Sequence, residues 1–325
     1  MAFVSVSGNW VESIVTLLQN QTSDWEMCRV GYESLKTVKV KEFDFDGFKI
    51  KVQCNPGRMT STSAKVDSKS IKERKCFLCV DNLPSEQNGI RYATDYQILV
   101  NPFPIFNEHF TLPSIKHQPQ QIESSLDTLL DFSKDLGERH IVFYNGPKCG
   151  ASAPDHLHFQ AGERNFIPLF DEYHLLSEMY GKEVLSDDSF SLTAIDDGLR
   201  KYISIKSTDK EKILVLFNKF IKTYKEFMNS EDEPMFNILS SYDVELKEWL
   251  VLIFLRKKHR PSHYFDTLEK QILLSPAAVD ISGVCITPRE EDFNKIDKDI
   301  LTEIFREVFI SSDELNEFIN KLKSI

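Results

Sequence analysis

The sequence predicts an α+β fold made of two half-domains, each with a mainly antiparallel sheet flanked by helices. The strand-like segments occur as hairpins and pairs, and they do not alternate strictly with helices as parallel sheets require. Each half also contains a long helix, a strand pair and a separate strand that ends in a proline. We expect the second half to be degenerate, because its strand at 248–255 has Val251 and Ile253 where the first half has histidines.

The elements of the first half follow from local patterns. Apolar residues at helical spacing near the N-terminus predict an amphipathic helix. These residues are Val11, Ile14, Val15 and Leu18. Residues 36–54 alternate polar and apolar side chains around Asp46-Gly47, which predicts a hairpin. A turn is expected at 55–58 and buried strands at 96–101 and 140–144. Between these strands, Pro119 is expected to open a helix that Gly137 ends.

The second half is predicted in the same way. A long helix is expected from about Asp209 to Met228, followed by strands at 235–241 and 248–255. A third strand at 282–288 precedes a helix with an apolar face that includes Ile300 and Ile304. The last helix is expected to begin with a capping box formed by Ser311 and Glu314.

Composition and charge exclude several classes of function. The chain of 325 residues can bury a sizeable core, and its formal net charge is −11, with 39 Lys and Arg against 50 Asp and Glu. Because binding to the phosphate backbone of nucleic acids depends on clustered positive charge, no nucleic-acid partner is expected for this acidic chain. The N-terminus lacks the basic region of a signal peptide, and no apolar run is long enough to span a membrane. The six cysteines are therefore expected to be thiols or metal ligands of a cytoplasmic protein.

The segment NGPKCGASAPDHLHFQ, residues 145–160, is the strongest candidate for a functional site. On a strand, His156, His158 and Gln160 would share one face, with Leu157 and Phe159 on the other. A turn containing glycine offers backbone N–H groups to an anion, and nearby Asn and Ser side chains add neutral donors. This combination favours a phosphate group, although two histidines at this spacing also occur as surface or core pairs.

A second candidate site is Cys76-Phe77-Leu78-Cys79, which lies between turn-forming segments. Zinc prefers four N or S ligands in a tetrahedron, and this spacing can place two thiolates around one ion. The candidates for the other two ligands are His109 and His156. Two free thiols or a redox pair are the alternatives. His117 and His140 are expected to be structural.

Residues 145–160 resemble the active-site signature of the histidine-triad superfamily. The H-x-H-x-Q form is similar to the branch that contains galactose-1-phosphate uridylyltransferase, diadenosine tetraphosphate phosphorylase and GDP-L-galactose phosphorylase, and HLHFQA is closest to the last of these. Residues 55–58 with 76–79, and 101–104 with 109–113, resemble further segments of the uridylyltransferases in the same order. The resemblance implies that residues 36–180 form a catalytic, histidine-triad-like half. It also implies that residues 181–325 complete the substrate site.

The resemblance implies a covalent mechanism with His158 as the nucleophile. A nucleotidyl-histidine would form and then pass its nucleotide to an acceptor phosphate in ping-pong fashion. Gln160 would hold phosphoryl oxygens without supplying a proton, which favours transfer over hydrolysis. The resemblance further implies a structural zinc ion held by Cys76, Cys79, His109 and His156. The candidate substrate-binding residues are Arg58, Asn101, Asn145, Gly150, Ser152, Lys258 and Arg260.

Two departures from the uridylyltransferases bear on the substrate. Asp155 separates Pro154 from His156, and the C-terminal half lacks the second histidine-rich metal motif of some uridylyltransferases. The sequence hypothesis is therefore a nucleotidyltransferase or phosphorylase that acts on a nucleotide sugar, with inorganic phosphate or a sugar 1-phosphate as acceptor. The alternatives are a phosphorylase or hydrolase of dinucleoside polyphosphates, and a catalytically silent nucleotide-binding or zinc-scaffolded protein. A homodimer would fit the resemblance.

Overall fold

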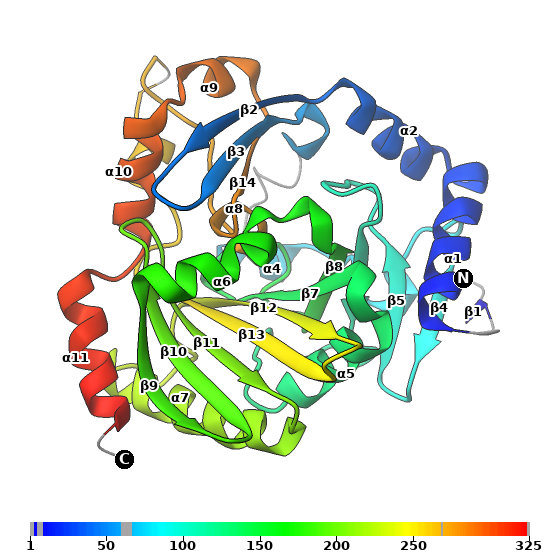
Figure 1. Cartoon of the computed structure of the whole chain (residues 1–325). Coiled ribbons are helices and arrows are strands. Elements are labelled where there is room, and N and C mark those ends of the chain that lie inside the picture. The colour runs from blue at the N-terminus through cyan, green and yellow to red at the C-terminus, as the bar shows by residue number, and fades with distance from the viewer. Residues whose placement is uncertain (1–2, 5–8, 60–66, 268, 324–325) are drawn as a thin grey trace.

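The computed structural model describes residues 3–4, 9–59, 67–267 and 269–323. Its centre is a large mixed sheet, and a smaller sheet lies over one face of it (Figure 1). Helices cover both faces, so the predicted α+β class with large antiparallel sheets is confirmed. Within these residues, no helix is long and apolar enough to cross a membrane.

The large sheet runs without interruption from the N-terminal to the C-terminal part of the chain. All its pairings are antiparallel except that between β1 and β4. Strands β7 and β12 pair side by side, with Asn145 opposite Asn237, and this pairing joins the two halves. In spatial order the described strands are β1 (Phe3–Val4), β4 (Gly89–Tyr92), β5 (Tyr96–Val100), β6 (Phe110–Pro113), β8 (His158–Glu163), β7 (His140–Asn145), β12 (Phe236–Asp243), β13 (Glu248–Leu255), β11 (Lys201–Ser207), β10 (Phe190–Asp196) and β9 (Gly181–Asp187).

The small sheet combines segments from opposite ends of the chain. The hairpin of β2 (Lys39–Asp44) and β3 (Lys49–Cys54) confirms the predicted hairpin, and Gly47 has a φ of 81° at its turn. Strand β14 (Val284–Thr287) pairs with β3 in parallel. Its backbone places the C-terminal part of the chain directly over the first half of the large sheet (Figure 1).

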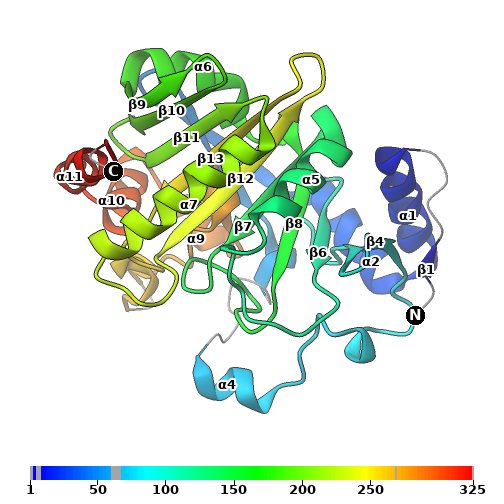
Figure 2. The same ribbon diagram turned by 90° about the horizontal axis from the view of Figure 1, so that it is seen from below.

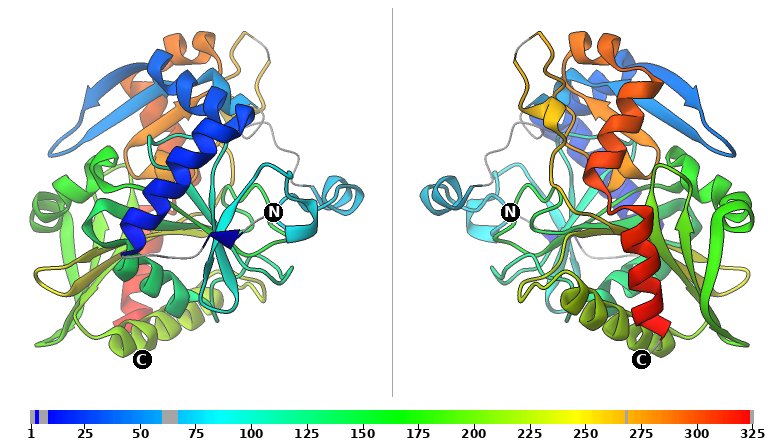
Figure 3. Two further views of the ribbon diagram at one scale, coloured as in Figure 1. Left: turned by 90° about the vertical axis from the view of Figure 1, so that its right-hand side faces the viewer. Right: turned by 90° about the vertical axis from the view of Figure 1, so that its left-hand side faces the viewer.

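The helices form two layers, one on each face of the large sheet. One face is covered by α1 (Trp10–Asp24), α5 (Leu126–Leu136), α7 (Lys210–Phe227) and α11 (Ser312–Lys323) (Figure 2). The other face is covered by the small sheet with α6 (Pro168–Tyr180), α8 (Ala278–Ile281), α9 (Glu290–Lys295) and α10 (Lys298–Val308). Figure 3 shows these layers from the side, together with α2 (Glu26–Ser34) and the outlying α4 (Ser68–Glu73).

Most predicted elements agree with the structure in kind and place. Helix α7 begins after Asp209, whose carboxylate caps it by accepting from two backbone N–H groups. The capping box of α11 is confirmed, since the Ser311 N–H donates to Glu314 and the Glu314 N–H donates to the Ser311 hydroxyl. Strands β12 and β13 lie within one or two residues of the predicted ranges.

Three predictions differ from the structure. Helix α5 begins at Leu126, because Pro119 and the residues after it form a non-helical connection. Strand β8 begins at His158, so His156 lies in the turn before it and not on the strand face. The meander β9–β11 was not predicted at all.

Candidate active site

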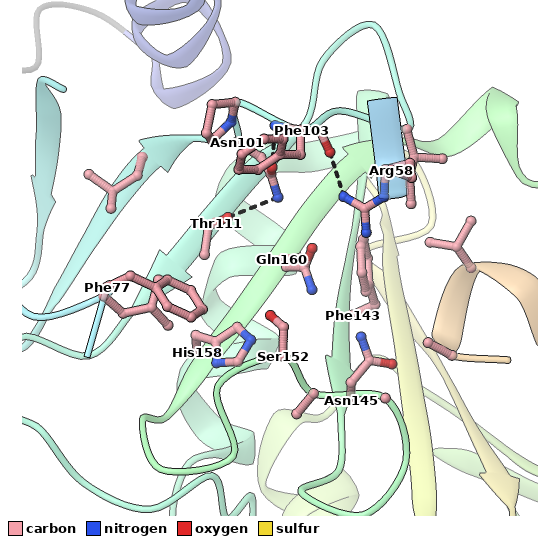
Figure 4. Close-up of a pocket in the computed structure, with 18 of the residues that line it drawn as sticks. Arg58, Phe77, Asn101, Phe103, Thr111, Phe143, Asn145, Ser152, His158 and Gln160 are labelled. Atoms are coloured by element: carbon pink, nitrogen blue, oxygen red, sulfur yellow. Dashed lines mark hydrogen bonds between the residues drawn. The ribbon is translucent and has the colours of Figure 1, made fainter. Parts of the chain in front are cut away.

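A cavity of about 390 Å³ lies between the large sheet and the elements that cover it. Its floor is formed where β6, β8 and β7 meet, and its cover comes from α8 and β14 of the C-terminal part. Figure 4 shows that side chains of the 145–160 segment point into it beside Arg58. The cavity therefore brings together both ends of the chain around the segment that the sequence indicated.

His158 is placed at the start of β8, with its ring in the wall of this cavity. Its neighbours Leu157 and Phe159 face the opposite core, as strand alternation requires. The Nδ1 atom of His158 lies 2.8 Å from the carbonyl oxygen of His156. A carbonyl oxygen only accepts, so Nδ1 carries the proton and Nε2 keeps its lone pair. Burial lowers the pKa of His158 to about 4, which keeps the imidazole neutral at physiological pH.

Gln120 lies in no motif of the sequence, and its side chain fixes the backbone around His158. Its carbonyl oxygen accepts from the His158 backbone N–H at 2.8 Å. Its amide nitrogen donates to the backbone oxygens of His158 and Asn145, at 3.0 and 2.9 Å. Gln120 is fully buried, so these bonds are shielded from water and hold the ends of β7 and β8 together.

His109 lies beside Gln160 and not beside the two cysteines. Its Nδ1 accepts from the Ile105 N–H at 3.1 Å, so its Nε2 carries the proton and donates to the Gln160 oxygen at 3.0 Å. Burial and the nearby Arg58 lower the pKa of His109 to about 3, which keeps it in this neutral form. The structure thus replaces the expected ligand role of His109 by one of orienting the Gln160 amide.

Asn145 is oriented by residues from the second half of the sheet. Its side-chain oxygen accepts from the Asn237 amide at 2.7 Å and from the Ala278 backbone N–H at 2.8 Å. Arg256, which is fully buried, in turn donates to the Asn237 oxygen at 2.8 Å. With its oxygen so occupied, Asn145 presents its NH₂ group to the cavity that it lines. No local sequence pattern connects these residues, because their contact depends on the β7–β12 pairing.

The turn between β7 and β8 brings two further predicted residues to the cavity. Gly150 has a φ of 102°, and a Cβ atom there would lie 2.6 Å from the Cβ of Ala277. Glycine is required at this position, since an L side chain would be strained and would collide with the cover. Ser152 follows, and its side chain lies near those of His158 and Gln160 (Figure 4).

The positively charged candidates divide into two groups. Arg58 lines the cavity and donates a hydrogen bond to the Phe103 carbonyl oxygen at 2.5 Å. Asn101 also lines the cavity, and its side chain accepts a hydrogen bond from the Phe103 N–H and donates one to the Thr111 hydroxyl. Arg260 also lines the cavity, as does His259. Lys258 lies elsewhere, because its amino group pairs with Glu307 at 3.2 Å on the surface.

The opposite end of the cavity is apolar. Trp25 and Met27 come from the start of α2, and Phe77 and Leu78 come from the cysteine-containing turn. Leu83 and Pro84 complete this wall. Phe77 is 46% exposed, which is unusual for so large an apolar side chain. In Figure 4, Phe77 and Arg58 lie on opposite sides of the cavity, with His158 close to Phe77, and Arg260 also lines the cavity.

A group of four metal-ligating side chains lies beside the cavity. It consists of Cys76, Cys79, His117 and His156, whose ligand atoms all lie within 4.8 Å of one another. His117 was expected to be structural, yet its Nδ1 is 3.2 Å from the Cys79 sulfur. The Nδ1 of His156 is 3.2 Å from Cys76 and 3.6 Å from Cys79.

The chemistry and spacing of this group fit zinc. A tetrahedral ion with sulfur and nitrogen ligands separates those ligands by roughly 3.3–3.8 Å. Both histidines also turn Nδ1 toward the thiols and Nε2 away from them. Nε2 of His156 lies 2.7 Å from the Ser114 carbonyl oxygen, and Nε2 of His117 faces the Asp155 carboxylate at 3.9 Å. The Ser114 carbonyl is a hydrogen-bonded outer acceptor of the kind that orients metal-binding histidines, whereas the Asp155 carboxylate lies beyond hydrogen-bond distance of His117.

Comparisons with known proteins agree with this architecture. Residues 17–163 match the model of a domain of unknown function, DUF4922, and residues 204–325 match that of the GDPGP1-like C-terminal domain. The structure of yeast Ap4A phosphorylase Apa2 in complex with Ap4A superimposes with a TM-score of 0.59, covering 94% of this chain and 99% of that one at 14% identity. The complex of Apa2 with AMP gives 0.57. This chain has the Apa2 fold.

Sequence comparison finds the same group of proteins. Protein APA1 of Saccharomyces cerevisiae is 24% identical over 229 residues, which are 62% of this chain and 64% of APA1. Diadenosine 5',5'''-P1,P4-tetraphosphate phosphorylase 2 of the same yeast is 26% identical over 180 residues, or 49% of this chain and 54% of that protein. The matched segments thus span less than two thirds of either yeast protein. These similarities support the predicted resemblance to the branch that contains the Ap4A phosphorylases.

Proposed function

We propose that this protein is a phosphorylase of dinucleoside polyphosphates that works through a nucleotidyl-histidine on His158. The proposal rests chiefly on the free Nε2 lone pair of a neutral, buried His158, placed among amide, hydroxyl and guanidinium donors. The similarity to yeast Ap4A phosphorylases favours this substrate class over the nucleotide sugar that the sequence hypothesis placed first.

In the first half-reaction, Nε2 of His158 attacks the α-phosphorus of one nucleotide and forms a P–N bond. The P–O bond to the next phosphate breaks, and the remaining nucleoside polyphosphate leaves with that electron pair. Such a leaving group is already a stable anion, so no general acid is required. The developing positive charge on the ring is spread toward Nδ1, whose proton is held by the His156 carbonyl oxygen.

In the second half-reaction, an oxygen of inorganic phosphate attacks the same phosphorus and the P–N bond breaks. The products are a nucleoside diphosphate and a free, neutral His158. Asn145 and Gln160 carry out no proton transfer, because an amide does not titrate. They donate N–H groups to the phosphoryl oxygens, and fixed donors stabilise the charge that develops in the transition state.

The shape of the cavity supports a long, two-ended substrate. Its apolar end, with Trp25 and Phe77, offers a surface for stacking of a nucleobase. Arg58 and Arg260 supply the local positive charge that an acidic protein needs in order to hold a polyphosphate. Zinc bound by Cys76, Cys79, His117 and His156 would have a structural role, because it would fix the turn beside His158.

A nucleotide-sugar phosphorylase is the second candidate. The HLHFQA segment resembles GDP-L-galactose phosphorylase, and the C-terminal residues match the GDPGP1-like domain. Both candidates share the chemistry at His158 and differ only in the leaving group.

Product analysis tests the proposal and separates the candidates. The protein would be incubated with Ap4A, Gp4G, ADP-glucose and GDP-glucose, each with and without inorganic phosphate, and the products separated by chromatography. We expect a nucleoside diphosphate from the dinucleoside substrates only when phosphate is present. Phosphate-independent release of a nucleoside monophosphate would indicate hydrolysis, and binding without turnover would indicate a silent nucleotide-binding protein. Turnover of the sugar nucleotides alone would favour the second candidate.

A further inference from the structure

Asp155 occupies an unusual place in the molecule. It stands directly before His156, yet it lies outside the metal-binding group and does not line the cavity. One of its carboxylate oxygens lies 2.5 Å from a terminal nitrogen of Arg74, and the other lies 3.9 Å from Nε2 of His117. Both partners belong to segments far from it in the sequence.

Arg74 connects this carboxylate to the wall of the cavity. Its guanidinium group lies over the ring of Phe77, 5.0 Å from the ring centre. Phe77 is part of the turn that holds Cys76 and Cys79, and it lines the apolar end of the cavity. The side chains of Arg74 and Asp155 are only 23% and 18% exposed, so their ion pair is shielded from solvent more than a surface pair.

We propose that Asp155 is a positioning residue that locks the cysteine-containing turn against the start of β8. Its carboxylate holds Arg74, and through it Phe77, and it also orients the His117 ring toward Cys79. One side chain thereby sets both the metal-binding group and the aromatic wall of the cavity. The nucleotide-binding part of this inference rests on the proposed function, whereas the metal-binding part is independent of it.

Alternative roles for Asp155 fit the structure less well. One of its oxygens is bound to Arg74 and the other lies 3.9 Å from Nε2 of His117, and Asp155 is not among the residues that line the cavity with His158. A purely surface role conflicts with its low exposure. The second terminal nitrogen of Arg74 is buried and has no partner among the described residues. Without Asp155, a partly buried guanidinium would lose its counter-ion, which is costly.

The test uses the full chain and measures two affinities. Zinc affinity would be measured with zinc alone, by competition with a chromophoric chelator. AMP affinity would be measured by calorimetry on the zinc-loaded protein. We expect Asp155→Asn to weaken zinc binding by roughly tenfold or more, as loss of an outer-shell partner does, and to weaken AMP binding as well. Asp155→Glu should recover most of both affinities because it keeps the charge.

Arg74→Met separates the two functions and remains informative if Asp155→Asn fails to fold. It should weaken AMP binding and leave zinc affinity close to that of the wild type, because Asp155 still faces His117. A variant that combines Asp155→Asn with Arg74→Met should lose no more AMP affinity than Asp155→Asn alone, because both substitutions break the same ion pair. Glu290→Gln, which removes an exposed ion pair with Lys39 in the small sheet, is the matched control and should change neither affinity.

Wild-type zinc affinity in Asp155→Asn would overturn the inference, as would wild-type AMP affinity in Arg74→Met. The inference would also be contradicted if the double variant lost AMP affinity by the product of the two single losses. A wild-type protein that binds no zinc would contradict it as well. A protein that shows the expected zinc results but transfers no nucleotide would refute the proposed function and leave the positioning role of Asp155 intact.

Discussion

The Nε2 atom of His109 lies 3.0 Å from the side-chain oxygen of Gln160, a residue that lines the cavity. Because Nδ1 of the same ring accepts from the Ile105 N–H, the direction of this bond is fixed. Gln160 therefore has its side-chain NH₂ group left for the cavity that it lines. The orientation of this amide is set by a buried histidine that is not among the residues lining the cavity.

Replacing His109 should reduce turnover without releasing the metal. We expect His109→Leu to lower kcat by about tenfold or more, because the Gln160 amide is free to rotate and one fixed donor is lost. Zinc content, measured by mass spectrometry of the metal, should stay at the wild-type level. Loss of zinc in this variant would show that His109, as the sequence resemblance implied, is a ligand after all.

The metal-binding group makes a separate prediction about composition. We expect about one zinc ion per chain, lost in Cys76→Ser and strongly reduced in His117→Ala, since both side chains belong to the tetrahedral group. Metal analysis of the purified protein, after dialysis against a weak chelator, is the measurement. A His117→Ala variant with full zinc content would remove His117 from the site.

Gln120 should contribute to both stability and catalysis. Gln120→Leu removes three buried hydrogen bonds, so we expect the free energy of unfolding to fall by about 3 kcal/mol, at roughly 1 kcal/mol for each bond. Urea unfolding would measure this loss, and kcat should also fall because His158 and Asn145 lose their common support. Gln118→Leu is the control, since that side chain makes one bond to the Ser114 hydroxyl. Equal effects of the two substitutions would contradict the role given to Gln120.

The stability of the protein should depend on pH through Glu233. Burial raises the pKa of this carboxyl to about 7, while it accepts hydrogen bonds from the Tyr144 hydroxyl and the Ile122 N–H. A raised pKa favours the folded state when the group is protonated. We expect that contribution to be complete below about pH 4.5 and to be lost as the pH rises through about 7, a change of ~3 kcal/mol.

Glu233→Gln tests this dependence, since the amide has the same shape and does not ionise. The free energy of unfolding would be measured in urea at pH 5 and at pH 8 for both proteins. The wild type should lose more stability between these values than the variant. An identical pH dependence would exclude Glu233 as its source.

The sequence predicted the fold better than it predicted the surroundings of the site. Strand pairs, caps and the hairpin at Gly47 depend on local patterns, and these agree with the structure. The meander β9–β11 was missed, although its middle strand alternates apolar and polar residues. Tertiary packing, which the sequence does not show, decides which histidine completes the metal-binding group with the cysteines. His109 and His117 lie at opposite ends of β6, and only the latter reaches Cys79.

The residues that position the site were not predictable from spacing. Gln120 and Asn237 act through contacts between segments distant in the sequence, and neither lies in a recognisable motif. Asp155 was visible as an insertion before His156, yet its partner Arg74 is far from it in the sequence. Lys258 was a candidate substrate-binding residue, and its pairing with Glu307 could be found only in the folded chain.

The central claim is that His158 carries the nucleotide between donor and acceptor. Intact-protein mass spectrometry after brief incubation with Ap4A, without phosphate, tests it most directly. We expect the wild-type mass to increase by that of one adenylyl group, and the increase to disappear when phosphate is added. Asn145→Ala should form the adduct more slowly, and His158→Ala should form none and show no turnover. Turnover by His158→Ala, or phosphorolysis by the wild type with no trapped adduct, would contradict the account.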